Sequence, residues 1–176
     1  KYASWIRWKG APNADGTLKP VIVIRNCTCA EVCNFRILFD TPCSDAIVIS
    51  NIKNVKPGTP ITSRCRIHDI LMDAGTNGNK WMNDGVRIDS SYFGGPDQNN
   101  EYHKIYDCDI ANFSHAGVGI YSSQAHRVKV SECQFSQSGS PLGTGVYARF
   151  ASMTMENCKG GNLGLVFYGS DQYAGG

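Results

Sequence analysis

The sequence predicts an all-β protein built as a solenoid of parallel strands, and three observations support this. Ile (14) and Val (11) total 25 residues against 6 Leu, a balance that favours strands over helices. Gly, Asn, Ser and Asp are frequent, which indicates many turns. A short motif also recurs at steps of 25, 18, 38, 25 and 25 residues. Periods in this range are typical of stacked units that bury their apolar faces on one another.

Each copy of the motif begins with an in-out-in triplet and continues into a polar corner. The alternation is that of a strand with one buried face. Two residues after the triplet stands an Asn, Asp or Glu, and Asn and Asp tolerate the left-handed backbone of a sharp bend. The triplets are residues 22–24, 47–49, 65–67, 103–105, 128–130 and 153–155, and the corners are Asn26, Asn51, Asp69, Asp107, Glu132 and Asn157.

A further strand opens with glycine in the later repeats. Its copies start at Gly85, Gly117, Gly145 and Gly164, and residues 35–39 are expected to take its place in the first repeat. Insertions at 76–83, 94–102 and 136–144 fall at matching joints. Loops that gather on one side of a solenoid commonly shape its binding face.

The Gly-Val-x-Ile strand, the Asn corner and the Cys/Ile slot after it resemble the right-handed parallel β-helix of pectin-lyase-like proteins. That group includes pectate lyases, polygalacturonases, alginate-modifying enzymes and bacteriophage tailspikes. The resemblance covers residues 21–170 and implies a single domain of about six to seven coils. Residues 1–20 would cover one end and 171–176 would form a tail. Because the repeat pattern runs close to both ends, we expect a fragment of a longer chain.

The cysteines are expected to be interior thiols rather than a disulfide framework. Cys27, Cys108, Cys133 and Cys158 occupy a slot that Ile52 and Ile70 also fill, and free Cys behaves as a small hydrophobe. A disulfide among Cys29, Cys33 and Cys43 remains open. Zinc is the weaker alternative there, since the spacing matches no common finger. No metal site and no cofactor are predicted.

Charge and hydropathy argue against two classes of binding partner. The net charge of +2 gives no global field that would attract nucleic acid or a membrane. No apolar run approaches the ~20 residues of a membrane span. Neither nucleic acid nor a membrane is therefore a predicted partner.

Cations recur at the outward middle position of three successive triplets. Arg66, Lys104 and Lys129 would lie about 5 Å apart in neighbouring strands, so a polyanionic ligand would explain the arrangement. The alternative is that these long side chains extend into solvent at little cost.

The glycine-led strand carries the stronger candidate for a binding surface. Its outward ladders contain a mixture of Arg, Asp and Tyr, with Asp84 and His115 just ahead of the strand. Tyrosines offer flat faces to sugar rings, and Asp and Arg add directional hydrogen bonds; the alternative is simple sheet stabilisation by cross-strand aromatics. The ladder residues expected to bind substrate are Arg87, Tyr121, Tyr147, Arg149 and Tyr168, together with Arg66, Lys104 and Lys129.

The candidate catalytic residues are Asp84, Asp89 and His115. Glycoside hydrolysis needs two carboxyl groups roughly 5 to 10 Å apart, and Asp84 and Asp89 make a poor pair because they are expected to point differently. Asp84 is therefore the expected acid or base, with His115 as its neighbour. The alternative for His115 is a loop residue bonded to the backbone. Residues 83–86 and 114–117 faintly resemble polygalacturonase elements, but the paired-aspartate and Arg-Ile-Lys elements of that family are missing.

These observations lead to three functional hypotheses. The first is a carbohydrate-recognising module that also cleaves polysaccharide, as a lyase or glycoside hydrolase, in the manner of a tailspike. The second is a structural spacer without a ligand, and the third is a secreted plant or algal polysaccharide enzyme. The first implies an acidic polysaccharide partner, a homotrimer, and an extracellular or virion-surface location.

Overall fold

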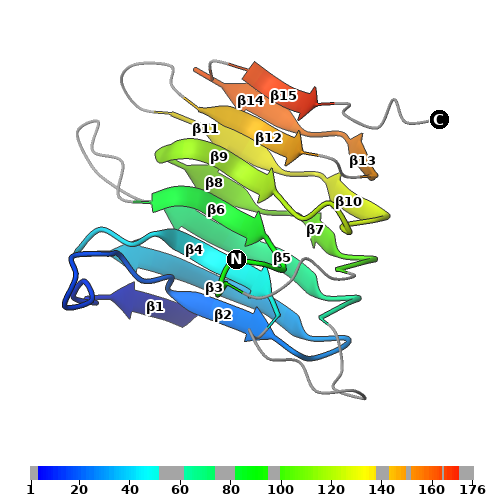
Figure 1. Ribbon diagram of the computed structural model, residues 1–176. Coiled ribbons are helices and arrows are strands. Elements are labelled where there is room, and N and C mark those ends of the chain that lie inside the picture. Colours follow the sequence, from blue (N-terminus) through cyan, green and yellow to red (C-terminus); the bar gives the residue numbers. More distant parts are fainter. Residues whose placement is uncertain are drawn as a thin grey trace.

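The computed structural model describes residues 4–51, 62–73, 82–94, 100–137, 143–149, 152–163 and 165–170, which form an all-β structure of two parallel sheets (Figure 1). Sheet A contains β1 (Ser4–Trp8), β3 (Glu31–Phe39), β5 (Arg66–Asp73), β7 (Lys104–Tyr106), β8 (Asp109–Ala111), β10 (Val128–Ser131), β11 (Gln134–Ser136), β13 (Met153–Glu156) and β14 (Lys159–Gly161). Sheet B contains β2 (Ile22–Arg25), β4 (Asp45–Ser50), β6 (Met82–Ile88), β9 (Phe113–Ile120), β12 (Thr144–Arg149) and β15 (Leu165–Ser170). The described residues form no helix, and hence none that could cross a membrane.

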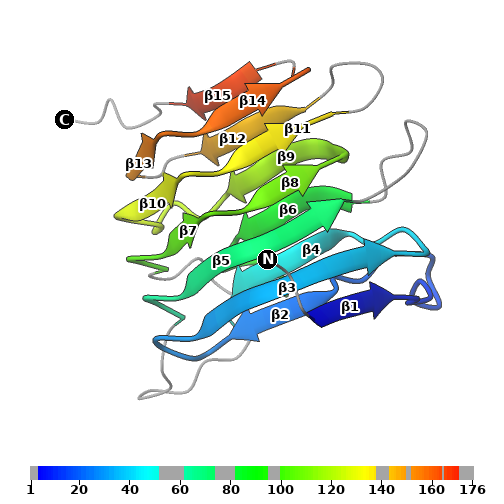
Figure 2. The same cartoon turned by 180° about the vertical axis from the view of Figure 1, so that it is seen from behind.

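The chain alternates between the two sheets and adds strands to both in steps. Sheet B runs β2-β4-β6-β9-β12-β15 in sequence order, and every registered pair in either sheet is parallel. In sheet A the long β5 pairs with both β7 and β8 of the next passage, because a bend at Asp107 divides that passage into two strands. Figure 1 shows sheet B in front, and Figure 2 shows sheet A from the other side.

The inward positions of both sheets meet in one apolar core. Residues in register on successive strands are fully or almost fully buried there, as the period-2 alternation predicts. They include Ile67, Ile105 and Val130 in sheet A and Val86, Val118 and Val146 in sheet B. Each added strand therefore buries its inner face on the strand before it and on the opposite sheet.

Left-handed backbone is confirmed at five of the six predicted corners, although Asn26 follows β2 of sheet B and the other four belong to sheet A. Asn26, Asp69, Asp107, Glu132 and Asn157 all have left-handed backbone, with φ between 50° and 54°. Short polar side chains visit this region at least cost, so the sequence pattern and the backbone agree. Asn51 lies elsewhere, after β4, where its side-chain oxygen accepts a hydrogen bond from the Thr62 N–H at 2.9 Å.

Two parts of the predicted repeat alignment are wrong. Triplets 22–24 and 47–49 lie in β2 and β4 of sheet B, in register with β6, and residues 35–39 lie in β3 of sheet A. The last glycine-led strand is shifted by two, because Tyr168 rather than Val166 pairs with Tyr147. An in-out-in triplet shows which face of a strand is buried but not which sheet the strand joins, so triplets from the two sheets look alike in the sequence.

The cysteine prediction holds for the later repeats. All eight cysteines are free, and Cys108 and Cys133 are buried. The thiols of Cys108, Cys133 and Cys158 each donate to two backbone carbonyls at equivalent positions. Cys27 differs, since it lies against Cys65 rather than in this column, and burial raises the pKa of Cys65 to about 12. Ile52 lies outside the described residues.

Candidate functional site

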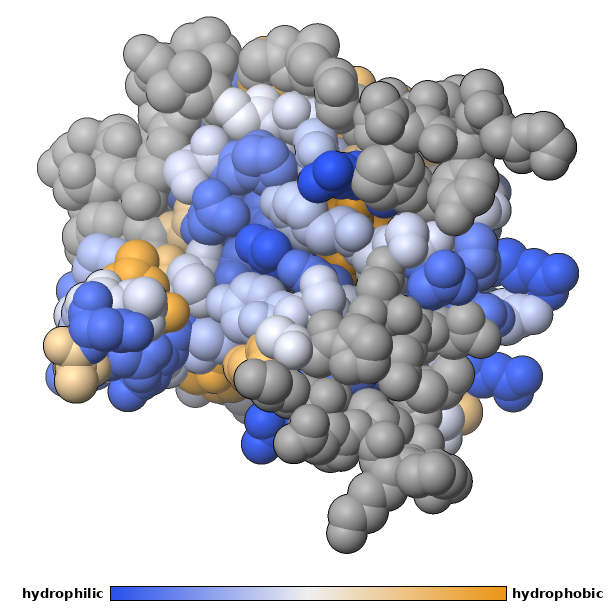
Figure 3. Space-filling view, viewed as in Figure 1, coloured by the Kyte–Doolittle hydropathy of each residue, from blue (hydrophilic) through white to orange (hydrophobic). Residues whose placement is uncertain are grey.

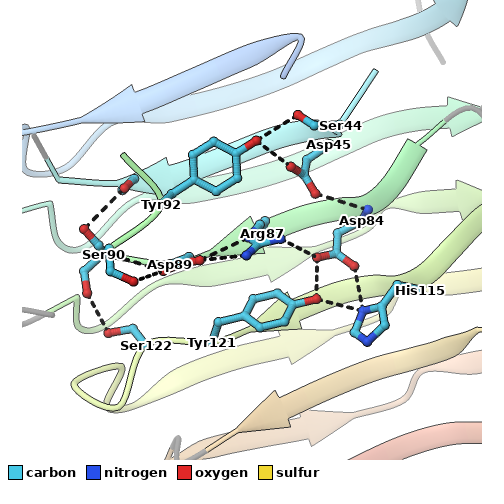
Figure 4. Close-up of polar contacts among 12 residues, drawn as sticks. Ser44, Asp45, Asp84, Arg87, Asp89, Ser90, Tyr92, His115, Tyr121 and Ser122 are labelled. Carbon is cyan, nitrogen blue, oxygen red and sulfur yellow. Dashed lines mark hydrogen bonds and ion pairs between the residues drawn. The ribbon is translucent and has the colours of Figure 1, made fainter. Parts of the chain in front are cut away.

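The predicted site residues divide between two faces of the molecule. Arg66, Lys104 and Lys129 lie on sheet A, in β5, β7 and β10. The others belong to sheet B or to the turns that follow its strands: Asp84, Arg87, Asp89, His115, Tyr121, Tyr147, Arg149 and Tyr168. The side chain of Tyr168 is outside the described part. The sheet B face in Figure 3 is mostly hydrophilic, and Figure 4 shows that most of its predicted residues converge.

A glycine brings Asp84 and Arg87 to the same side of β6. At Gly85 an added Cβ would lie 2.4 Å from Ile110 Cγ2 and 2.7 Å from the Gly117 carbonyl oxygen, so only glycine fits. The strand alternation is interrupted here, and the register with β9 also shifts between Met82 and Asp84. Irregularities of this kind re-aim side chains next to functional sites. Asp84 and Arg87, three positions apart, therefore share the outer face (Figure 4).

The carboxylate of Asp84 is fully buried and accepts hydrogen bonds from three groups. Its Oδ1 lies 3.0 Å from His115 Nδ1 and 3.0 Å from the Ala116 N–H, and its Oδ2 accepts from the Tyr121 hydroxyl at 2.7 Å. Gly119 leaves room for this contact, because a Cβ there would be 2.8 Å from Asp84 Oδ2 and 2.6 Å from the Tyr121 ring. Three donors, two on β9 and one just after it, hold this carboxylate in one orientation.

His115 is the solvent-facing member of this cluster, with its side chain 40% exposed. It belongs to β9 and bonds to Asp84, so its interpretation as a loop residue bonded to backbone is wrong. Its Nδ1 also lies 2.7 Å from the Tyr121 oxygen, whose own proton goes to Asp84. Both neighbours therefore accept from Nδ1–H, which assigns the tautomer with an unprotonated Nε2. The hydrogen bond to Asp84 raises the pKa of His115.

Three tyrosine rings lie around Asp84, His115 and Arg87. The His115 ring meets the Tyr147 ring edge to face at 4.8 Å, and the Tyr121 and Tyr147 ring centroids are 5.5 Å apart. The Arg87 guanidinium lies 4.2 Å from the centre of the Tyr121 ring and 5.0 Å from that of Tyr92. A cation held between two aromatic faces is fixed in place, so Arg87 presents a positioned positive charge beside Asp84.

Asp89 lies at the edge of this cluster and faces away from His115. Its Oδ2 accepts from the Arg87 Nη2 at 2.8 Å, and its Oδ1 accepts from the N–H and hydroxyl of Ser91. The side chain is almost buried. In this geometry Asp89 orients Arg87 and closes the turn after β6, so Asp84 and Asp89 do point differently. Arg149 is exposed at the end of β12.

Sequence reasoning missed Asp45 and Tyr92. Asp45 on β4 pairs in register with Asp84, and its Oδ2 accepts from the Tyr92 hydroxyl at 2.9 Å. Burial, and then the charge of Asp84, raise the pKa of Asp45 to about 6. The signal was present, since residues 45–48 (Asp-Ala-Ile-Val) match residues 84–87 (Asp-Gly-Val-Arg). Assigning residues 47–49 to the other sheet concealed the match.

The raised pKa of Asp45 predicts a specific pH dependence. The folded protein keeps a proton that the unfolded chain releases near pH 4, so Asp45 lowers the free energy of unfolding as the pH rises from about 4 to 6. The contribution is on the order of 3 kcal/mol. Because Asn resembles the protonated acid, an Asp45→Asn variant should gain stability relative to the parent across this window. Urea unfolding at several pH values measures the difference, and parallel profiles would contradict the assignment.

The three predicted cations of sheet A are in register on neighbouring strands, as expected. Lys104 pairs with Arg66 on one side and Lys129 on the other. Arg66 lies 3.9 Å from Glu31, and Lys129 Nζ lies 2.7 Å from Glu156. Because sheet A and sheet B enclose the core between them, these cations face a different direction from the Asp84 cluster.

No protein-family model matches the chain, and neither a curated protein nor a solved structure does. Within the described ranges, no group of three or more His, Cys, Asp or Glu is arranged to hold a metal ion. The chemistry of the site is therefore interpreted from its own geometry.

Proposed function

We propose that the protein is a right-handed parallel β-helix that binds an acidic polysaccharide on the outer face of sheet B and cleaves it by β-elimination. The alternation of the chain between two parallel sheets supports the fold, since parallel crossovers are right-handed in nearly all proteins. The observation that carries the function is the Asp84–His115–Tyr121 cluster beside an Arg87 held between two tyrosines.

The cluster has the parts that removal of an activated proton requires. The Nδ1–H of His115 is held by Asp84, so its Nε2 is oriented as a general base toward the exposed side. In a uronate sugar the proton next to the carboxylate becomes acidic when a cation neutralises that carboxylate. Arg87 and the exposed Arg149 supply cations on this face, and Tyr147 offers a flat surface to a sugar ring.

The proposed step moves one proton to His115 and breaks one carbon–oxygen bond. His115 Nε2 takes the proton from the ring carbon that bears the carboxylate. The electron pair of that C–H bond forms a carbon–carbon double bond, and the bond from the adjacent carbon to the glycosidic oxygen breaks. The leaving oxygen receives a proton from Tyr147 or water. The products are a new reducing end and an unsaturated sugar.

Elimination fits the geometry better than hydrolysis by paired carboxylates. A glycosidase would need one carboxylic acid at the glycosidic oxygen and a second carboxylate across the bond. Asp45 and Asp84 are adjacent, but both side chains are buried, and the oxygens of both are occupied by hydrogen bonds from Tyr92, the Asp84 N–H, His115, the Ala116 N–H and Tyr121. The exposed acid–base group is His115.

The proposal is tested by incubating the protein with polygalacturonate, alginate and hyaluronan. We expect ultraviolet absorbance from an unsaturated product together with new reducing ends for at least one of them, and a His115→Gln variant should lose both signals. Reducing ends without ultraviolet absorbance would replace elimination with hydrolysis. If the protein neither cleaves nor binds any of the three polymers, a purely structural role is favoured.

That second candidate is a structural spacer. The observation that favours it is the same set of buried and satisfied hydrogen bonds, which would stabilise sheet B even without a ligand. Homotrimeric assembly and display outside the cell or on a virion belong to the proposal as well. The mass of the particle in solution would test the homotrimer.

A further inference from the structure

One corner of sheet A is occupied by residues that rarely adopt its backbone. Cys29, Arg64, Tyr102 and Arg127 have φ of 60°, 55°, 60° and 55°. The N–H of each of the first three donates to the carbonyl just before the next member, at Ser63, Glu101 and His126. A left-handed residue other than Gly, Asn or Asp costs about 1–2 kcal/mol. The Asp69 and Asp107 corners place Asp in the same conformation. Long side chains kept at a costly backbone position point to a role for those side chains.

The long side chains of this corner form a stack. The Tyr102 ring has Arg64 at 5.5 Å from its centre on one side and Arg127 at 5.1 Å on the other, and Arg127 also donates to the Tyr102 hydroxyl. Arg64 and Arg127 are exposed, and Tyr102 is 38% exposed. The ring therefore holds two guanidinium groups at fixed positions, one strand apart on either side.

The cations already found on sheet A stand beside this stack. Arg66, Lys104 and Lys129 each follow a stack residue by two positions, so five cations lie at this corner and at the starts of three neighbouring strands. A groove of about 460 Å³ runs between Arg64, Arg66, Tyr102 and Lys104, with Cys29 and Glu31 in its lining. Glu31, the acid in this lining, is 3.9 Å from Arg66, and Glu156, outside the lining, is 2.7 Å from Lys129. No described carboxylate forms an ion pair with Arg64, Lys104 or Arg127.

We propose that this basic groove is a second binding site, for a carboxylated or sulfated polysaccharide that runs across the strands of sheet A. Charges repeat along the groove at the strand spacing of about 4.8 Å, which is similar to the length of one sugar residue in a linear chain. Guanidinium groups bind carboxylate and sulfate oxygens with paired hydrogen bonds. The site lies on the other sheet from the Asp84 cluster and does not depend on cleavage there.

The geometry favours a glycan over a single-stranded nucleic acid. Proteins that bind single strands stack bases on open aromatic faces. The Tyr102 ring has two arginines over it, so it is not an open platform for a base, and charge and hydrogen bonding are the expected means of recognition. Regularly spaced guanidinium groups can each form paired hydrogen bonds with the carboxylate or sulfate groups along a flexible polysaccharide chain.

The test is the affinity of the full chain for dextran sulfate and for polygalacturonate, measured by calorimetry at several ionic strengths. A double variant, Arg64→Gln with Arg127→Gln, should lose about tenfold or more in affinity and show a weaker salt dependence. Arg36→Gln with Lys159→Gln is the matched control: it removes two exposed cations from sheet A outside the groove and changes the net charge equally. Its affinity should change less than about twofold.

Two further measurements separate this site from the one on sheet B. Tyr102→Leu keeps all five charges but removes the stack, and should also weaken binding. Dextran sulfate carries no uronate carboxylate for the Asp84 cluster to act on, so its affinity reports on this site and failure of the cleavage proposal would not affect that result. The proposal is overturned if the parent protein binds neither polymer, if the double variant and its control lose affinity equally, or if a single-stranded oligonucleotide binds more tightly than both glycans.

Discussion

Replacement of Asp84 by Asn should lower the rate of the proposed polysaccharide cleavage by about three to four orders of magnitude. The carboxylate accepts from His115 Nδ1 and from Tyr121, and it fixes the tautomer that exposes Nε2. An amide at this position presents an N–H to one of these donors and can turn the imidazole into the wrong tautomer. The expected loss lies in the turnover number more than in the Michaelis constant, because Asp84 is buried away from the substrate.

The effect of Asp84 on the pKa of His115 can be measured without enzymatic activity. Because Asp84 raises the pKa of His115, Asp84→Asn should lower it, and a titration of the His115 ring followed by NMR measures the change. Asp107→Asn is the matched control, since Asp107 is exposed and its left-handed backbone accepts Asn readily. If Asp84→Asn retains full activity and an unchanged His115 pKa, Asp84 does not position the histidine.

Replacement of Phe135 by Ala should reduce the free energy of unfolding by about 3–5 kcal/mol. Phe135 is one of the largest fully buried side chains, and it lies between the sheets against Gly117 of β9. Removing the ring leaves a cavity in the core between sheets A and B. Chemical denaturation measures the loss. The same substitution at Phe167, which is 48% exposed, is the control and should cost less than about 1 kcal/mol.

Gly117 offers a second test of the same packing. An added Cβ would lie 2.2 Å from Phe135 Cδ1 and 2.8 Å from the Gly145 carbonyl oxygen, so Gly117→Ala alone should destabilise by about 1–3 kcal/mol. Combined with Phe135→Ala, the clash with the ring disappears. The double variant should therefore lose less than the sum of the two single losses. Strict additivity would show that the ring and the glycine do not press on each other.

Much of the fold could be predicted because apolar and polar residues alternate along the sequence with the two-residue period of a β-strand. The pattern of Ile and Val identifies inward positions, and Asp69, Asp107 and Asn157 mark left-handed corners by their own chemistry. The sheet to which a strand belongs is not encoded in this way. Residues 22–24 and 47–49 have the same alternation as residues 103–105, and only the insertions between them decide which strand meets which.

The candidate site was found in part for the same reason. Asp84, Arg87, His115 and Tyr121 stand close to one glycine-led strand or to its neighbour, so their proximity follows once these strands are aligned. Asp45 and Tyr92 reach the site from β4 and from a turn after β6. Tyr102 and its two arginines occupy a corner where propensity favours Asn, so pattern reasoning passed over them.

The free thiols of Cys108, Cys133 and Cys158 can be used to measure local opening of the fold. Hydrogen bonding with Cys108 and burial raise the pKa of Cys133, so the folded protein suppresses the thiolate that alkylating reagents attack. Cys29 is exposed and Cys158 is half-buried. The rate at which a reagent alkylates each of these thiols therefore reports how often the strands around it open. A gradient from Cys158 to Cys133 to Cys108 would reveal fraying from one end, whereas equal rates would reveal a single cooperative unit.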